Sequence, residues 1–170
     1  ATTSGVELEV KGRAADLLPA LLPDAKALNL RGSLNFYRSR VAALPGPDNR
    51  LDGQQPWTAT LGFDQRIAGL PLAVGGSLGL NPGYDTQLTL DQIVRRSHTT
   101  SVDLWGQWIF RPGLSMRLAM AAGVQPFGPG NGTTTTLYST GDYSRTERYT
   151  RPQINLQLDR KSTRLNSSHI

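Results

Sequence analysis

The stretch from Trp57 to Leu90 constrains the fold more than any other part of the chain. Between Trp57 and Asp64, apolar residues occupy the odd positions, with polar or small residues between them. After a short link around residues 68–69, a second apolar series runs on one parity as far as Leu90. A period of two predicts strands whose two faces meet different surroundings. The second series covers about twenty residues, whereas a globular strand usually has about five or six. A hairpin this long predicts a large two-faced sheet, for which a membrane barrel is the natural candidate.

The same alternation occurs in five further segments, so the sequence predicts an all-β fold. We expect an antiparallel up-and-down meander of about seven long strands that is part of a larger transmembrane β-barrel. The links near residues 68–69 and 111–113 are short, and those at 42–56, 91–100 and 125–151 are expected to be long loops. Short turns at one rim and long loops at the other are typical of bacterial outer-membrane barrels. The link 14–27 is long for the short side, and its two Leu-Leu-Pro runs suggest a short helical turn or an apolar cap. The five further segments are Val6–Val10, Leu28–Tyr37, Val102–Phe110, Leu114–Ala122 and Ile154–Leu158.

Composition leaves two architectures open. No run of eighteen apolar residues is present, which excludes a transmembrane helix, and without cysteine no disulfide or thiolate metal site can form. In a barrel, the leucines and valines of each strand would face lipid, and polar residues such as Glu7, Arg31, Asp64 and Asp103 would line the lumen. Aromatic residues near strand ends, such as Trp57 and Trp108, would suit interfacial girdles. A soluble β-sandwich produces the same alternation. Strand length and the loop asymmetry favour the barrel.

The C-terminal residues 159–170 are treated as a non-native tail. Asp159 to His169 reads as the translation of a common DNA-sequencing adapter, which assigns residues 1–158 to the partial barrel. The tail contains one acidic residue, Asp159, and three basic residues, Arg160, Lys161 and Arg164. Its removal therefore lowers the formal net charge from +5 to +3. The basic character therefore gives no support to nucleic-acid binding, and no nucleic-acid partner is expected.

No motif in the chain predicts chemistry. Gly75–Gly79 matches the G-x-S-x-G pattern of a nucleophile elbow, but strand alternation continues after Ser77 and no helix follows. Residues 48–53 lack the carboxylates of a calcium loop, and residues 128–132 lack the spacing of a dinucleotide-binding turn. His98 is the single histidine before the tail, so no histidine pair can hold a metal. We expect no enzyme activity, no catalytic residue, no cofactor and no metal.

Four segments resemble the C-terminal barrel strands of TonB-dependent outer-membrane receptors. They are Gly5–Glu9, Leu28–Leu34, Gln55–Asp64 and Leu114–Leu118, and the resemblance covers nearly all of residues 1–158. It implies a 22-stranded barrel in the bacterial outer membrane, with an upstream plug domain through which the TonB complex energises uptake of a siderophore or similar scarce nutrient. Nothing in the chain matches the plug. The expected partners are outer-membrane lipid, the TonB complex and a siderophore-like ligand.

Ligand contacts are expected in the long loops, because binding groups usually lie on loops held by a rigid scaffold. The candidate ligand-binding residues are Tyr138, Tyr143, Arg145, Arg148 and Tyr149. Two other functions stay open at this point, a porin-like channel in the outer membrane and a soluble β-sandwich binding module. An isolated piece of barrel would expose two unpaired edges and an apolar face, so we expect residues 1–158 not to fold stably alone in water.

Overall fold

The alternating segments form eleven β-strands and one short helix in the computed structural model, which describes residues 1–124, 131–149 and 152–160. All strand pairings are antiparallel. The elements are β1 (Thr2–Arg13), α1 (Ala14–Leu17), β2 (Leu28–Arg40), β3 (Trp57–Arg66), β4 (Leu72–Asn81), β5 (Tyr84–Thr89), β6 (Gln92–Arg96), β7 (Thr99–Arg111), β8 (Leu114–Val124), β9 (Asn131–Tyr138), β10 (Tyr143–Tyr149) and β11 (Gln153–Arg160).

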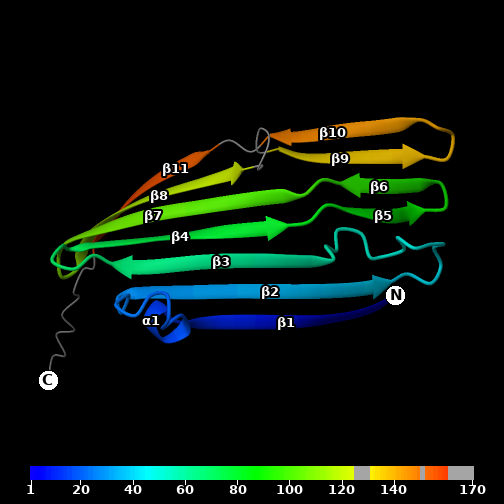
Figure 1. Cartoon of the computed structure of the whole chain (residues 1–170). Coiled ribbons are helices and arrows are strands. Elements are labelled where there is room, and N and C mark those ends of the chain that lie inside the picture. Colours follow the sequence, from blue (N-terminus) through cyan, green and yellow to red (C-terminus); the bar gives the residue numbers. More distant parts are fainter. Residues whose placement is uncertain (125–130, 150–151, 161–170) are drawn as a thin grey trace, which may run out of the picture.

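The strands form two sheets that follow one another along the strand direction (Figure 1). The larger sheet has seven strands in the order β1-β2-β3-β4-β7-β8-β11, and the smaller has four in the order β10-β9-β6-β5. The order of the larger sheet is that of the predicted meander of about seven strands. Two of its turns are replaced by the hairpins β5–β6 and β9–β10, which extend the sheet at one end.

The strand register separates an apolar face from a polar one across all seven strands. One cross-strand row contains mainly apolar residues and two glycines: Gly12, Leu30, Phe63, Gly76, Leu104, Met120 and Ile154. The adjacent row lies on the opposite face and consists of polar and small residues: Lys11, Arg31, Gly62, Ser77, Asp103, Ala121 and Gln153. The two-residue period of each strand is therefore in phase across the whole sheet.

The apolar face has no second layer over it in the described part of the chain. The exposed fraction is 61% for Val6, 57% for Leu61 and 70% for Leu156, which lie on strands at the edges and in the middle of the sheet. Apart from glycines, Ala14 and Val94 are the only buried apolar residues in the described part of the chain. A soluble sandwich would cover this face with its second sheet. The described residues form a single layer whose leucines and valines remain uncovered.

Small residues on the polar face allow large side chains to lie flat against the sheet. A Cβ at Gly75 would come within 2.5 Å of the Trp105 ring, so this ring occupies the space above the glycine. The Arg117 guanidinium lies 4.7 Å from the centre of the same ring. On the neighbouring strands, Arg31 donates to Asp64 Oδ2 at 2.7 Å. Cross-strand contacts of this kind fix the register from the polar side.

The predicted uninterrupted strand over residues 70–90 is wrong, because β4 ends at Asn81 and β5 begins at Tyr84. Pro82 has no N–H to donate to a neighbouring strand. Gly83 lies so close to the neighbouring strand that a Cβ there would be 2.9 Å from the Arg96 carbonyl oxygen. The register nevertheless continues across this interruption, since Asn81 pairs with Thr99 and Tyr84 pairs with Arg96. Residues 72–89 and 92–108 therefore form one long hairpin with a joint in each arm, whereas the predicted hairpin from Trp57 to Leu90 is paired only between β3 and β4.

Two of the three predicted long loops contain strands. Residues 91–100, predicted to be a loop, contain β6 and the first residues of β7. Within 125–151, β9 and β10 form a hairpin, and residues 125–130 and 150–151 lie outside the described residues. Residues 42–56 contain no helix or strand, as predicted. The predicted short turns near 68–69 and 111–113 are confirmed, with positive φ angles at Gly69 and Gly113.

The two ends of the sheet differ as the link lengths predicted. The end that holds the turns 67–71 and 112–113 also holds α1, and the hairpin tips and the segment 41–56 lie at the opposite end (Figure 1). We call these the turn end and the loop end. Helix α1 confirms the short helical turn proposed for the 14–27 link, and its Leu17 packs against Gly12.

The described residues do not close into a barrel. Strand β1 and strand β11 are the edges of the seven-stranded sheet, and β5 and β10 are the edges of the smaller one. No helix in the described part of the chain has the length and apolarity needed to cross a membrane. Of the tail, Asp159 and Arg160 continue β11, and residues 161–170 lie outside the described residues.

Candidate binding site at the loop end

The segment 41–56 is held against the edge of the hairpin β5–β6. The Gln87 amide of β5 donates to the Asp48 carbonyl oxygen at 2.8 Å. Arg96 of β6 donates to Asp52 Oδ1 at 2.7 Å. Thr86 is completely buried in this region. Backbone and side-chain contacts together therefore bring residues 48–52 next to a part of the chain that is more than thirty residues away in sequence.

Tyr84 lies at the centre of this junction, with two arginines on its ring. The guanidinium carbons of Arg50 and Arg96 are 5.8 Å and 5.5 Å from the ring centre, within the range of a cation–π contact. Arg50 Nε and Arg96 Nη1 are buried and have no hydrogen-bond partner in the described part of the chain. A buried donor without an acceptor costs about 1–3 kcal/mol. The junction therefore contains guanidinium N–H groups that no described acceptor satisfies.

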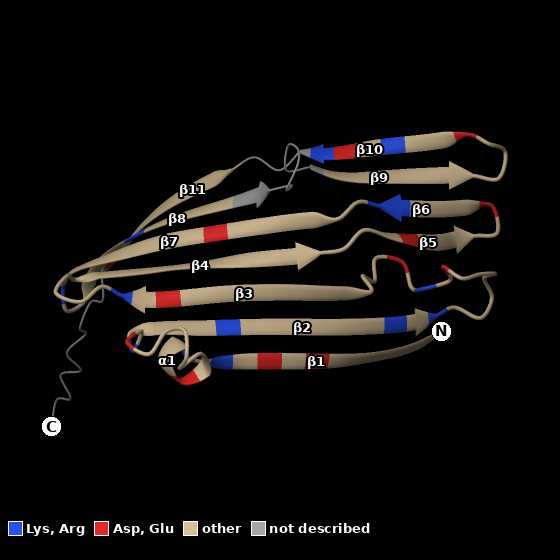
Figure 2. Ribbon diagram, viewed as in Figure 1, with Lys and Arg blue, Asp and Glu red and all other residues tan. Residues whose placement is uncertain are grey.

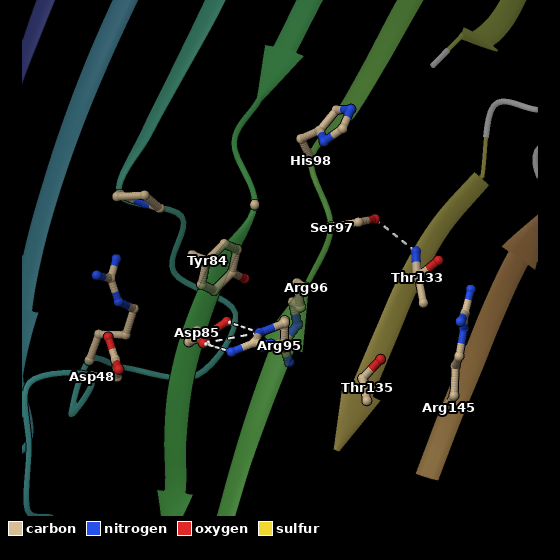
Figure 3. Close-up of a pocket in the computed structure, with 13 residues that line it drawn as sticks. Asp48, Tyr84, Asp85, Arg95, Arg96, Ser97, His98, Thr133, Thr135 and Arg145 are labelled. Atoms are coloured by element: carbon tan, nitrogen blue, oxygen red, sulfur yellow. Dashed lines mark hydrogen bonds and ion pairs between the residues drawn. The ribbon is translucent and has the colours of Figure 1, made fainter. Parts of the chain in front are cut away.

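An open depression of about 720 Å³ lies beside this junction (Figure 3). Its wall combines residues from the segment 41–56 with residues of β5, β6, β9 and β10. The arginines exceed the acidic residues in the wall, and hydroxyl groups supply further donors. The charged residues are Asp48, Arg50, Asp85, Arg95, Arg96 and Arg145, and the hydroxyl residues are Tyr84, Ser97, Thr133 and Thr135. Figure 2 shows how charged residues gather at this end of the molecule, whereas they are scattered along the seven-stranded sheet.

Asp85 and Arg95 form the most complete ion pair in the depression. The Arg95 Nε and Nη2 atoms donate to the Asp85 carboxylate at 2.9–3.2 Å (Figure 3). The hydrogen bond to Asp85 and the charge of that carboxylate raise the pKa of Arg95. Ser97 accepts a hydrogen bond from the Thr133 amide at 2.8 Å, which joins the β6–β7 joint to β9. These contacts fix the relative positions of β5, β6 and β9, three of the four strands that contribute to the wall.

The five residues predicted to bind ligand do not come together. Arg145 lines the depression and pairs with Glu147 at 2.7 Å. Tyr138 and Tyr143 lie beside the tip of the β9–β10 hairpin, and Tyr143 is 70% exposed. Arg148 and Tyr149 lie at the other end of β10, opposite Gly132 and Asn131. Among the described side chains of the predicted set, only Arg145 lines the depression.

The sequence-based prediction did not select Arg50, Tyr84, Asp85 or Arg95 for the site. Residues 91–100 are predicted to be a loop, whereas Arg95 and Arg96 lie in β6. A usable signal was present, because Tyr84, Asp85 and Arg95 follow the Pro82–Gly83 break within one hairpin. Arg50 reaches Tyr84 only through the docking of the segment 41–56, which no local pattern predicts.

The arrangement is suited to binding a polar, anionic ligand, because guanidinium groups and hydroxyls outnumber carboxylates. No group of three or more His, Asp or Glu side chains capable of holding a metal ion occurs in the described part of the chain. Ser77 lies within β4, and its hydroxyl donates to Asp103 at 3.3 Å, in the strand setting predicted for it. Comparison with protein-family models, with curated proteins and with solved structures finds no match for this chain.

Proposed function

We propose that this chain is a section of the wall of a bacterial outer-membrane β-barrel, of the TonB-dependent receptor type that takes up a siderophore-like ligand. The observation that carries the proposal is the apolar face, which runs in register across seven strands and is not covered by other described residues. In water, an apolar surface of this extent would be a liability. In a bilayer, it is the surface that contacts hydrocarbon.

Strand length and aromatic placement support the same function. A transmembrane strand needs about 9–11 residues, and β3, β4 and β8 have 10, 10 and 11. Phe36 pairs with Trp57 toward the loop end, and Trp108 pairs with Met116 toward the turn end. Aromatic residues at both limits of an apolar band are typical of membrane interfaces. The free edges of β1 and β11 are where further strands of a complete barrel would pair.

The receptor assignment rests on the resemblance of the strand sequences, and it separates this proposal from a porin-like channel. In such a receptor, the depression at the loop end would face the outside of the cell and make part of the ligand contacts. The TonB complex would act through the plug domain expected upstream. An excess of guanidinium donors in the depression supports an anionic ligand over a neutral one.

Cysteine scanning in lipid tests the membrane wall, and the chain has no cysteine of its own. Single cysteines at Leu61 and Leu118 would carry a polarity-sensitive fluorophore, with matched cysteines at the neighbouring Thr60 and Arg117. The chain would be refolded into vesicles that contain a fraction of nitroxide-labelled lipid. We expect quenching at positions 61 and 118 and little at 60 and 117, because neighbouring residues of a strand face opposite sides. Equal quenching at all four positions would overturn the proposal.

A further inference from the structure

A second, smaller depression lies at the loop end and contains three arginines. Its volume is about 300 Å³, and it is lined by Arg38 and Arg40 of β2, by Arg50 and by residues of the segment 46–49. Among the described residues, none that lines it is acidic. It is therefore distinct in charge from the larger depression, in which arginines and aspartates are mixed.

The three arginines have no ion-pair partner in the described part of the chain. The acidic residues nearest in sequence are engaged elsewhere: Asp52 pairs with Arg96, and Asp48 lines the larger depression. Arg38 and Arg40 are exposed, and the contact that Arg50 makes is with the Tyr84 ring. Three like charges around one small depression repel each other, and an anion bound among them would relieve that repulsion.

The arginines continue the apolar face rather than the polar one. In β2, residues 34, 36, 38 and 40 share one parity, so Arg38 and Arg40 follow Leu34 and Phe36 on the same side. Phe36, at the limit of the apolar band, pairs with Trp57 on the neighbouring strand. Arg38 lies two residues beyond it, or about 7 Å along the strand. The headgroup region of a leaflet is about 5–8 Å thick. Arg38 is thus at headgroup depth when the apolar face is in lipid.

We infer that Arg38, Arg40 and Arg50 form a binding site for the phosphate group of a membrane lipid headgroup. The inference rests on the proposed function, because that function places this face of β2 against the bilayer. Guanidinium groups donate paired hydrogen bonds to phosphate oxygens, which lysine does not reproduce. A lipid is favoured over a soluble anion because two of the three arginines, Arg38 and Arg40, follow the apolar band on its own side of the sheet.

The test measures how much of the full chain binds to two kinds of vesicle after the detergent that keeps the chain soluble has been diluted out. One kind is pure phosphatidylcholine, and the other is one part phosphatidic acid to four parts phosphatidylcholine. The variant R38Q/R40Q/R50Q is compared with K26Q/R66Q/R111Q, which removes the same charge at the turn end. Each basic residue at a membrane surface increases binding to anionic lipid by about fivefold. We expect the first variant to lose up to about a hundredfold of the preference for phosphatidic acid and the control to lose only a small part of it.

Two further measurements keep the outcome decisive. R38K/R40K/R50K retains the charge, and we expect it to lose part of the preference if paired hydrogen bonds are used. Circular dichroism of each variant verifies that strand content is unchanged. Equal losses in the site variant and in the control would overturn the inference. It would also be overturned if inorganic phosphate alone bound with the three arginines and phosphatidic acid gave no gain over phosphatidylcholine.

The result is separable from the test of the proposed function. If cysteines at Leu61 and Leu118 are embedded in lipid but phosphatidic acid gives no gain, the inference fails and the membrane wall stands. If phosphatidic acid binding depends on the three arginines while those cysteines remain in water, the wall fails and the phosphate site stands.

Discussion

The seven-stranded sheet and the four-stranded sheet are built from the same kind of antiparallel pairing, but they differ in what their faces carry. In the larger sheet, one face carries a band of mainly apolar residues that crosses every strand. In the smaller sheet, β9 contains four consecutive threonines and β10 contains two arginines and a glutamate. No comparable apolar face continues there. The change occurs at the joint at Pro82–Gly83, so this joint marks the limit of the surface that we assign to lipid.

The contrast between the two sheets indicates that strand length alone does not define the proposed membrane band. The predicted strand over residues 70–90 was long enough to cross a bilayer twice over, but only its first half keeps one parity apolar, with leucine and valine at every position except Gly76. The second half lies in a sheet with mixed charges and a binding depression. If the proposed barrel wall continues beyond the membrane as a polar hairpin, both halves are explained.

The largest expected effect comes from placing a charge on the apolar face. Leu61→Arg should destabilise the chain in lipid vesicles by about 2–4 kcal/mol, because an arginine near the bilayer midplane loses its hydration. Ser144→Arg, at an exposed position in β10, should change stability by less than about 0.5 kcal/mol. Urea titration of the refolded chain in vesicles measures both. If the two variants were equally stable, the contrast between the sheets would have no membrane basis.

A smaller effect is expected from filling the space beneath Trp105. Gly75→Ala places a Cβ where the indole ring lies, and we expect a loss of about 1–3 kcal/mol from overpacking. Gly106→Ala is the matched control, since a Cβ at that position meets nothing within 4 Å. Adding Trp105→Ala to Gly75→Ala should remove the clash, and the double-mutant cycle gives the coupling. Additive losses would show that the ring does not rest on Gly75.

Most of the larger sheet could be predicted because its signal is local. Residues such as Leu61 and Phe63 alternate with polar neighbours, and a two-residue period defines strands without knowledge of their partners. The segment 91–100 was predicted to be a loop because the consecutive residues Arg95 and Arg96 would place a charge on each face of a strand. Their strand depends on pairing with β5 on one side and β9 on the other, which is information from distant residues.

The candidate site was less predictable than the fold, for the same reason. Arg145 was selected because it lies in a segment rich in glycine, threonine and serine. Arg50 and Tyr84 are separated by 34 positions and meet only because Asp48 and Asp52 anchor the segment 41–56 to the hairpin. A contact that depends on two other long-range contacts produces no periodic pattern in the sequence.

The smallest expected effect compares one ion pair from each region. Asp52→Asn removes the partner of Arg96, whose side chain is 26% exposed, and we expect a loss of about 1 kcal/mol in the docking of the segment 41–56. Asp64→Asn removes the partner of Arg31, whose side chain is 45% exposed in the larger sheet, and we expect a loss of about 0.5 kcal/mol or less. Both effects should shrink as salt is added, because exposed charges are screened.

Hydrogen exchange of the Gln87 amide distinguishes these two losses better than global stability. That amide donates to the Asp48 carbonyl oxygen, so its protection reports whether the segment 41–56 remains docked. Asp52→Asn should speed exchange at Gln87 without changing the amides of β3, and Asp64→Asn should leave Gln87 unchanged. If both variants accelerated Gln87 equally, the two regions would open together as one cooperative unit. The joint at Pro82–Gly83 would then be a change of surface chemistry within a single rigid wall, and the loop-end site would be as stable as the sheet that carries it.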